Sequence, residues 1–244
     1  MVGVNELEFK SDNLPQDFKG KRIVFISDMH CGLYFSVERV REVVEGVNAL
    51  NPDIVLLGGD YTTRGGDSLG ECIDTFSGIN APLGVYGVLG NHDNWGEREN
   101  TLKFLGEAGV SVLENRGVWV QSGNSRIRVG GVSDLWTGKP DIEPVLDGVE
   151  ADDFVILLSH NPQYVKEISY RGVDLVLAGH THGGQMLPMR FLAPYLPSRL
   201  KQEYVFGWHD VGDTRLFVTN GLGTVFFPLR FMAPPEIVLL KLSR

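Results

Sequence analysis

The chain has 244 residues, a length that accommodates one large domain or two small ones. Hydrophobic residues make up 43% of it and charged residues 22%, which excludes a disordered, collagen-like or coiled-coil protein. The formal net charge of -9 leaves no broad basic surface, so we expect no binding to a nucleic-acid duplex. No positively charged stretch followed by an apolar run opens the sequence, so we expect no secretory leader, and no run approaches the roughly 18 apolar residues needed to span a bilayer. We therefore expect a cytoplasmic location, with membrane association and a removed native anchor left open.

The chain has only two cysteines, Cys31 and Cys72. Two are too few for a disulfide framework, and their spacing matches no zinc-binding motif. This usage favours a reducing compartment. We expect Cys31 to be a small buried residue rather than a ligand or a nucleophile.

Short apolar runs rich in β-branched residues predict strands, several of them covered on both faces. In chain order the runs are Arg22–Ile26, Asp53–Leu57, Val85–Leu89, Phe154–Leu158, Asp174–Leu177, Leu216–Thr219 and Glu236–Leu240. Between the first two runs, Ser36 can cap a helix whose apolar residues follow a period of 3.6 and which ends at Asn51-Pro52. These three elements predict a βαβ unit.

Two more helices and a hairpin complete the expected elements. The helices span Thr101–Ala108 and a segment from Asn161, as N-cap before Pro162, to about Tyr170. The hairpin pairs Gly117–Gln121 with Arg126–Gly131. No proline- or serine-rich linker divides the chain, so we predict one α/β domain over residues 1–244 with two sheets.

Polar side chains follow five of the predicted strands, at the point where each strand ends. They are Asp28-Met29-His30, Asp60, Asn91-His92-Asp93, His160 and His180-Thr181-His182, and they include five of the 6 histidines. Each cluster alone has an ordinary explanation, such as a cap, a turn or a hydrogen-bonded core histidine. Five together favour a ligand site, because open α/β sheets bind ligands at the carboxyl ends of their strands.

Seven of these side chains offer oxygen or nitrogen donors without a thiolate: Asp28, His30, Asp60, Asn91, His160, His180 and His182. Such a set favours Mn²⁺, Fe²⁺/Fe³⁺ or Zn²⁺ over Cu(I) or iron–sulfur clusters. Seven ligands exceed one tetrahedral zinc site. We therefore expect two divalent ions roughly 3.5–4 Å apart, bridged by a carboxylate, which suits in-line phosphoryl transfer.

In their order along the chain, these motifs resemble the five motifs of the calcineurin-like metallophosphoesterases. The matching residues are Asp28-x-His30, Gly59-Asp60, Gly90-Asn91-His92-Asp93, His160 and Gly179-His180-Thr181-His182. Gly179–Gln185 and the tail Pro228–Ile237 are similar to a bacterial branch with YkuE- and YaeI-like phosphodiesterases and some UDP-diacylglucosamine hydrolases. The resemblance implies the metallophosphoesterase fold, a four-layer α/β/β/α sandwich around two mixed β-sheets.

The resemblance also implies a role for each residue. Asp60 would bridge the two ions, and a bridging hydroxide would be the nucleophile. His92 would protonate the leaving oxygen, and Asp93 would orient a nearby imidazole. The first ion would be bound by Asp28, His30, Asp60 and His182, and the second by Asp60, Asn91, His160 and His180.

The segment Gly59–Gly65 is similar to a motif of the phosphoprotein phosphatases, with one departure. Thr63 stands where those enzymes have the aspartate that partners the catalytic imidazole, which weakens a protein-phosphatase interpretation. Arg64 matches their phosphate-contacting arginine, although a solvated loop arginine explains it equally well.

The motifs together predict a metal-dependent phosphoesterase, specifically a phosphodiesterase or pyrophosphohydrolase. The alternatives are a phosphomonoesterase and a non-catalytic scaffold of the same fold.

The apolar segment Met186–Leu200 is expected to be a loop beside the metals. It either forms a wall for a lipid-like leaving group or packs over the sheet, so a nucleotide-sugar or lipid-linked phosphoester and peripheral membrane contact are both considered. Trp95 either walls the mouth of the site or anchors a loop in the core, and His209 is expected at the surface.

Overall fold

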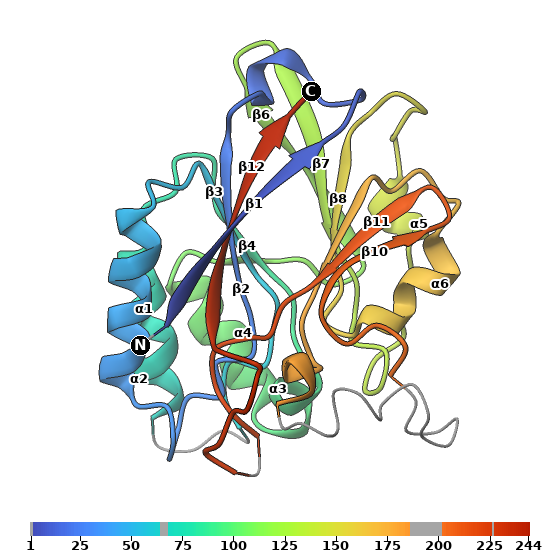
Figure 1. The fold of residues 1–244 in the computed structure, drawn as a ribbon. Helices are drawn as coiled ribbons and strands as arrows, with labels where there is room; N and C mark the ends of the chain where they lie inside the picture. Colours follow the sequence, from blue (N-terminus) through green and yellow to red (C-terminus); the bar gives the residue numbers. More distant parts are fainter. Residues whose placement is uncertain (1, 64–67, 186–201, 226) are drawn as a thin grey trace.

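The computed structural model describes residues 2–63, 68–185, 202–225 and 227–244. Within these ranges the strands form two six-stranded sheets that lie face to face at the centre of the molecule (Figure 1). The N-terminal and C-terminal strands both belong to the first sheet, where they lie side by side. Both sheets are mixed, as predicted.

The first sheet is parallel over four strands and is extended by the two chain ends. Strands β2, β3, β4 and β5 run parallel, while β12 is antiparallel to β2 and parallel to the edge strand β1. In spatial order the sheet consists of β1 (Gly3–Lys10), β12 (Glu236–Ser243), β2 (Arg22–Ile26), β3 (Ile54–Leu57), β4 (Val85–Gly87) and β5 (Ser111–Val112).

The second sheet has a parallel centre with an antiparallel strand at each edge. Strands β11, β9, β8 and β7 run parallel, and β10 and β6 close the edges as hairpin partners of β11 and β7. In spatial order it consists of β10 (Gly207–Val211), β11 (Thr214–Val218), β9 (Leu175–Ala178), β8 (Val155–Leu158), β7 (Ser125–Gly131) and β6 (Arg116–Ser122).

Helices cover the outer face of each sheet, on opposite sides of the molecule in Figure 1. The first sheet is covered by α1 (Val37–Ala49), α2 (Leu69–Asp74) and α4 (Arg98–Glu107), and the second by α5 (Glu143–Leu146) and α6 (Val165–Ile168). Helix α3 (Asn91–Trp95) lies at the strand ends. The described part of the chain also contains four short 3₁₀ turns: Gln16–Phe18, Thr75–Gly78, Pro162–Tyr164 and His182–Gly184.

Three hydrophobic clusters produce the four layers. In β2, Ile23 and Phe25 belong to the cluster between the two sheets, while Val24 and Ile26 belong to the cluster under α1. This division follows from the two-residue period of a strand, which turns alternate side chains to opposite faces. The third cluster lies between the second sheet and its helices. The continuous apolar runs of the sequence are therefore explained by burial on both faces, and the four-layer prediction is confirmed.

The chain-end and loop elements differ most from the expectations. Strand β1 was not predicted because its glutamates and lysine alternate outward on an exposed sheet edge, which leaves a weak apolar pattern. The helix predicted from Asn161 is shorter, with a 3₁₀ turn followed by α6, although the Asn161 side chain accepts a hydrogen bond from Gln163 N at 3.0 Å as expected of an N-cap. Ser36 precedes α1 without a capping side-chain bond.

Cys31 and Cys72 form a disulfide, with Cα atoms 6.4 Å apart. The bond joins the loop after β2 to helix α2, and both residues are buried. Cys31 is buried, as expected, but its pairing with Cys72 was not predicted, because the two cysteines are 41 positions apart in sequence and their spacing gave no signal. Disulfides persist in oxidising compartments, and the pairing argues against the expected reducing cytosol.

No helix in the described ranges is long and apolar enough to cross a bilayer. This finding agrees with the sequence pattern over the same residues.

Breaking the disulfide should lower the free energy of unfolding, because the bond closes a long loop in the unfolded chain. Because the cysteines are 41 positions apart, we expect Cys72→Ala or reduction to cost about 2–4 kcal/mol in denaturant unfolding. The Cys31→Ala/Cys72→Ala double variant is the control and should not respond to reductant. Alkylation of both thiols in unreduced, denatured protein would contradict the pairing.

Candidate metal centre

The strand ends of both sheets meet at one edge of the molecule and bring the polar clusters together. From the first sheet, Asp28 and His30 follow β2, Asp60 follows β3, and Asn91 opens α3 after β4. From the second sheet come the histidines that follow β8 and β9, namely His160, His180 and His182. All seven predicted donors therefore lie at one site, and all except His180 are buried.

Five of the seven donor residues have left-handed backbones. The φ angles are 56° for Asp28, 48° for His30, 54° for Asp60, 70° for His180 and 52° for His182. This region is unfavourable for residues with a Cβ atom and recurs at functional sites. Left-handed residues therefore mark the turns by which the chain leaves these strands and carries the donors.

Glycines permit the close approach of neighbouring loops around Asp60. Gly59 has φ of 93°, and a Cβ atom there would lie 2.5 Å from Gly90 N. A Cβ atom on Gly90 would lie 2.1 Å from Asp60 Oδ1. The glycines of these two motifs are therefore required by space at the site.

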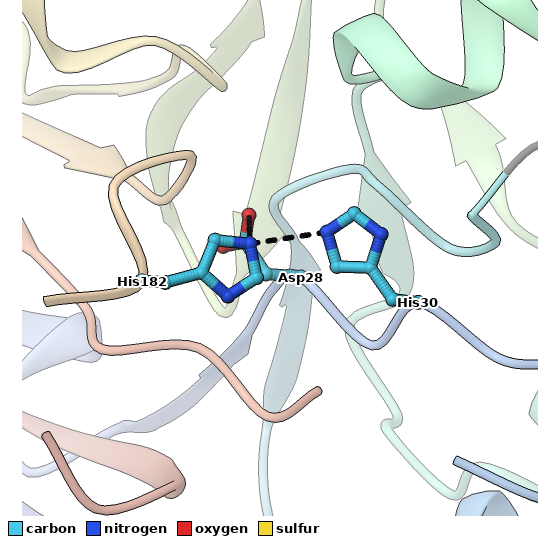
Figure 2. A group of neighbouring side chains, drawn as sticks. All are labelled: Asp28, His30 and His182. Carbon is cyan, nitrogen blue, oxygen red and sulfur yellow. Dashed lines mark hydrogen bonds and ion pairs between the residues drawn. The ribbon is translucent and has the colours of Figure 1, made fainter. Parts of the chain in front are cut away.

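The first group of donors consists of Asp28, His30 and His182 (Figure 2). His30 Nε2 lies 3.1 Å from His182 Nε2, which in turn lies 3.6 Å from Asp28 Oδ1. Two imidazole nitrogens and one carboxylate oxygen thus face a common point. The other Asp28 contact orders the neighbouring loop, because both carboxylate oxygens accept from His180 N, at 3.0 and 3.1 Å.

The second group consists of Asp60, His160 and His180. Asp60 Oδ2 lies 3.2 Å from His160 Nε2 and also 3.4 Å from His30 Nε2, which belongs to the first group. His180 Nδ1 lies 3.3 Å from His160 Nε2. In each group, one donor atom per residue lies within 4.8 Å of the others. Asp60 therefore stands between the two groups.

Burial and mutual charge set the protonation of the site. Burial lowers the pKa of His30 to about 4 and that of His180 to about 3, so these rings are neutral near pH 7. Burial alone would raise the pKa of Asp60, but the charge and the hydrogen bond of His160 outweigh it and hold this pKa well below its usual range. Burial raises the pKa of Asp28 to about 6. The site thus presents neutral imidazoles at His30 and His180 and a carboxylate at Asp60, the forms that bind metal ions. Burial alone would lower the pKa of His160, but the Asp60 carboxylate raises it well above its usual value, so this ring must lose a proton when a metal ion binds.

Unpartnered buried atoms show that a divalent cation fits this donor set. Asn91 Oδ1 and His180 Nε2 are buried and have no hydrogen-bond partner among the described residues. Such atoms are costly unless something satisfies them. A cation in the second group would satisfy Asn91 Oδ1, and one in the first group would accept the paired Nε2 lone pairs of His30 and His182. The oxygen and nitrogen donors suit Mn²⁺, Fe or Zn²⁺ equally.

His92 is held by the backbone of the Asp60 loop. Its Nδ1 lies 2.6 Å from the carbonyl oxygen of Thr63, which can only accept, so Nδ1 carries the proton. The ring packs edge-on against His30, with centroids 4.8 Å apart. Thr63 stands where the phosphoprotein phosphatases have an aspartate that partners the catalytic imidazole. In this protein the main-chain oxygen of Thr63 accepts the hydrogen bond from His92 instead. His92 also joins His30 and Asp60 in a third group of potential metal-binding atoms.

Asp93 differs from the expectation that it orients an imidazole. Its carboxylate accepts three backbone N–H groups, those of Asp60 at 2.8 Å, Tyr61 at 2.9 Å and Gly90 at 2.9 Å. Asp93 therefore fixes the Asp60 loop rather than a histidine ring. Burial raises its pKa to about 7, with the Asp60 charge adding to the effect.

Sequence reasoning missed the role of Arg230, although the tail that contains it was noted. Its guanidinium lies 3.3 Å from His182 Nδ1 and donates to the carbonyl oxygens of Gly223 and Asn220, each at 2.8 Å. Burial lowers its pKa to about 10, so it keeps its charge. Only long-range contact reveals this role, because 48 residues separate Arg230 from His182.

The remaining predicted residues have mixed outcomes. Arg64 and the segment 186–200 lie outside the described residues. Trp95 is 54% exposed beside His92, which excludes the alternative of a core anchor. His209 lies in β10, is partly exposed and contacts the Phe206 carbonyl oxygen, 3.1 Å from its Nε2.

Two mixed sheets inside four layers, with clustered carboxylates and imidazoles at their joined strand ends, define the metallophosphoesterase class of protein. The model of the family described as calcineurin-like phosphoesterase matches residues 21–184, more than half of the chain. The chain belongs to this family.

Individual relatives agree with the family match. The chain is 33% identical to the uncharacterized metallophosphoesterase YkuE of Bacillus subtilis, covering 100% of this chain and 86% of YkuE. It is 30% identical to the phosphodiesterase YaeI of Escherichia coli, covering 98% of this chain and 86% of YaeI. These relatives match the predicted bacterial branch. The chain spans less than two thirds of the length of several other curated relatives.

A solved structure supports the fold alone. The Thermus thermophilus protein TT1561 aligns with a TM-score of 0.56 at 13% identity, over 83% of this chain and 90% of its own.

Replacing Asp93 with asparagine should loosen the Asp60 loop, because the amide group points an N–H at a backbone N–H. We expect Asp93→Asn to lower the free energy of unfolding by about 1–3 kcal/mol and to weaken metal binding. Denaturant unfolding and elemental analysis after dialysis measure the two effects. Asp153→Asn is the matched control, because Asp153 accepts one exposed backbone N–H, from Glu150. Equal effects of the two variants would contradict the role given to Asp93.

Proposed function

We propose that the protein is a phosphodiesterase or pyrophosphohydrolase that depends on two divalent metal ions. The observation that carries the proposal is the pair of donor groups, Asp28/His30/His182 and Asp60/His160/His180, at the joined ends of the sheets. Each group has the size of one ion's coordination sphere. Asp60 lies within 3.4 Å of a histidine from each group, which supports its role as the bridge.

The residues that would hold each ion are those that the family resemblance implies, and these contacts support them. The first ion would be held by Asp28, His30, Asp60 and His182, and the second by Asp60, Asn91, His160 and His180. The unpartnered Asn91 Oδ1 supports its place in the second set. When bound, the ions supply Lewis acidity, which lowers the pKa of a water molecule and neutralises charge on the phosphate.

His92 is proposed to donate a proton to the leaving oxygen. Its Nδ1 proton is held by the Thr63 carbonyl, so a proton on Nε2 is the one that the ring can transfer. The ring is half-buried and stands beside the donor groups, as its contact with His30 shows. Asp93 fixes the loop that carries Asp60, and the Arg230 guanidinium lies beside Nδ1 of the His182 ring.

The diester specificity rests on likeness rather than on geometry. YaeI is named a phosphodiesterase, which favours this reaction over monoester hydrolysis. The intact donor set disfavours the alternative of a non-catalytic scaffold. The sequence-based expectation of a nucleotide-sugar or lipid-linked substrate, and of peripheral membrane contact, rests on segment 186–200. The function proposed here therefore covers only the hydrolysis of a phosphoester bond. Since both chain ends pair in one sheet and both sheets supply ligands, we treat residues 1–244 as one domain.

Metal removal should abolish activity reversibly. We expect strong chelation to eliminate hydrolysis of bis(p-nitrophenyl) phosphate and Mn²⁺ to restore it, with up to two ions per chain by elemental analysis. Asp60→Asn should lose both ions and turnover, because a bridging ligand touches both. The exposed Asp152→Asn variant is the control. Activity that survives chelation in metal-free protein would overturn the proposal.

His92→Ala should separate proton transfer from metal binding. We expect turnover to fall by roughly 10²–10⁴-fold while metal content stays near that of the unaltered protein. Because p-nitrophenolate leaves without a proton, the loss should be smaller for it than for an alkoxide leaving group. His209→Ala should change neither quantity. Metal loss equal to that of Asp60→Asn would instead make His92 a ligand, consistent with the third donor group.

A further inference from the structure

Two of the four tryptophans flank the metal centre and remain exposed. Trp95 is 54% exposed and its ring lies 5.2 Å from that of His92. Trp136 is 57% exposed and its ring lies 4.2 Å from that of His180, at 90°. Large indole rings are normally covered, because they contribute much of the apolar burial of a fold.

The other two tryptophans, Trp119 and Trp208, are packed against neighbouring side chains. Trp119 has the Arg126 guanidinium 3.8 Å above its ring, and Trp208 stacks on Phe9 and meets Phe217. Trp95 and Trp136 each have one recorded ring contact, and in both it is a histidine of the candidate metal centre. Both indoles therefore lie directly beside the metal centre and keep more than half of their surface open.

A chain of hydrogen bonds fixes the two indoles on one frame. Asn94 Nδ2 donates to Thr137 Oγ1 at 2.8 Å, and this hydroxyl donates to Asp134 Oδ2 at 2.8 Å. Asp134 Oδ2 also accepts from the backbone N–H groups of Trp136 and Thr137, both at 2.9 Å. Each tryptophan is therefore one residue away from the bond that joins helix α3 to the loop after β7.

We propose that Trp95 and Trp136 form a stacking platform that recognises a planar aromatic ring, such as a nucleobase, on the phosphoester substrate. The inference rests on the proposed function, because the phosphate must lie at the metal centre for the ring to reach the indoles. Rigid aromatic faces on a hydrogen-bonded frame suit a planar group, and stacking tolerates any base. Contact with His92, the proposed proton donor, places Trp95 on the side of the leaving group.

Competition between matched phosphates tests the platform. Adenosine 5′-monophosphate and ribose 5-phosphate differ by the base alone, and both should compete with bis(p-nitrophenyl) phosphate in Mn²⁺-loaded protein. One stacked base corresponds to between about fivefold and about a hundredfold in affinity. We expect the nucleotide to inhibit at least about fivefold more strongly. Trp95→Leu and Trp136→Leu should bring the two inhibition constants within about threefold, whereas the Phe variants should keep most of the difference.

Tryptophan fluorescence gives a second readout that needs no turnover. The nucleotide should quench emission in the unaltered protein and in Trp119→Phe, but much less in Trp95→Leu/Trp136→Leu. Equal inhibition by the two phosphates, or a difference that survives both Leu variants, would overturn the platform. Preference for octyl over methyl phosphate without a base effect would also overturn it, in favour of an apolar chain. If no diester is hydrolysed, the proposed function fails, and quenching alone still decides the platform.

Discussion

The contact of Asp60 with histidines from both sheets is the interaction on which the site depends. Its carboxylate lies between His30 of the first sheet and His160 of the second, with almost no solvent access. An ionised carboxylate is stable at such depth only when charge or hydrogen bonds compensate the loss of water. The two sheets must therefore pack so that imidazoles from one reach the carboxylates of the other. This requirement explains why the apolar contact between the sheets ends at a polar edge rather than continuing across it.

Around that carboxylate, the structure relies on the backbone as much as on side chains. Asp93 binds the N–H groups of the Asp60 loop, Thr63 offers a carbonyl oxygen to His92, and Arg230 donates to carbonyl oxygens beside His182. Fixed backbone groups hold a neighbouring side chain with little loss of rotamer freedom. The positions of the proposed ligands are thus determined by contacts one step removed from them.

The sequence predicted the convergence of the donors because two simple rules apply together. Strand ends can be found from apolar runs, and parallel strands place their carboxyl ends at one edge, so Asp28 had to lie near Asp60 in the first sheet and His160 near His180 in the second. That the two edges face each other was implied only by the resemblance to the family fold. The pairing of Cys31 with Cys72 and the contact of Arg230 with His182 depend on distances in space between residues far apart in sequence. The role of Asp93 was misassigned because a motif specifies the residue type but not which of its neighbours the carboxylate faces. Trp136 gave no signal, since neither burial nor ring contacts can be inferred from one residue.

The left-handed backbones of the donor residues also constrain how this fold can change over evolutionary time. Such a conformation costs about 1–2 kcal/mol for a residue with a Cβ atom and nothing comparable for glycine. A lineage no longer selected for the metal centre could replace His30, Asp60 or His182 by glycine and relieve that cost at each position. Loss of the donors is then favoured by stability, while their return is opposed by it. Loss of the metal-binding residues would therefore be hard to reverse, and the four-layer fold would persist after metal binding was lost.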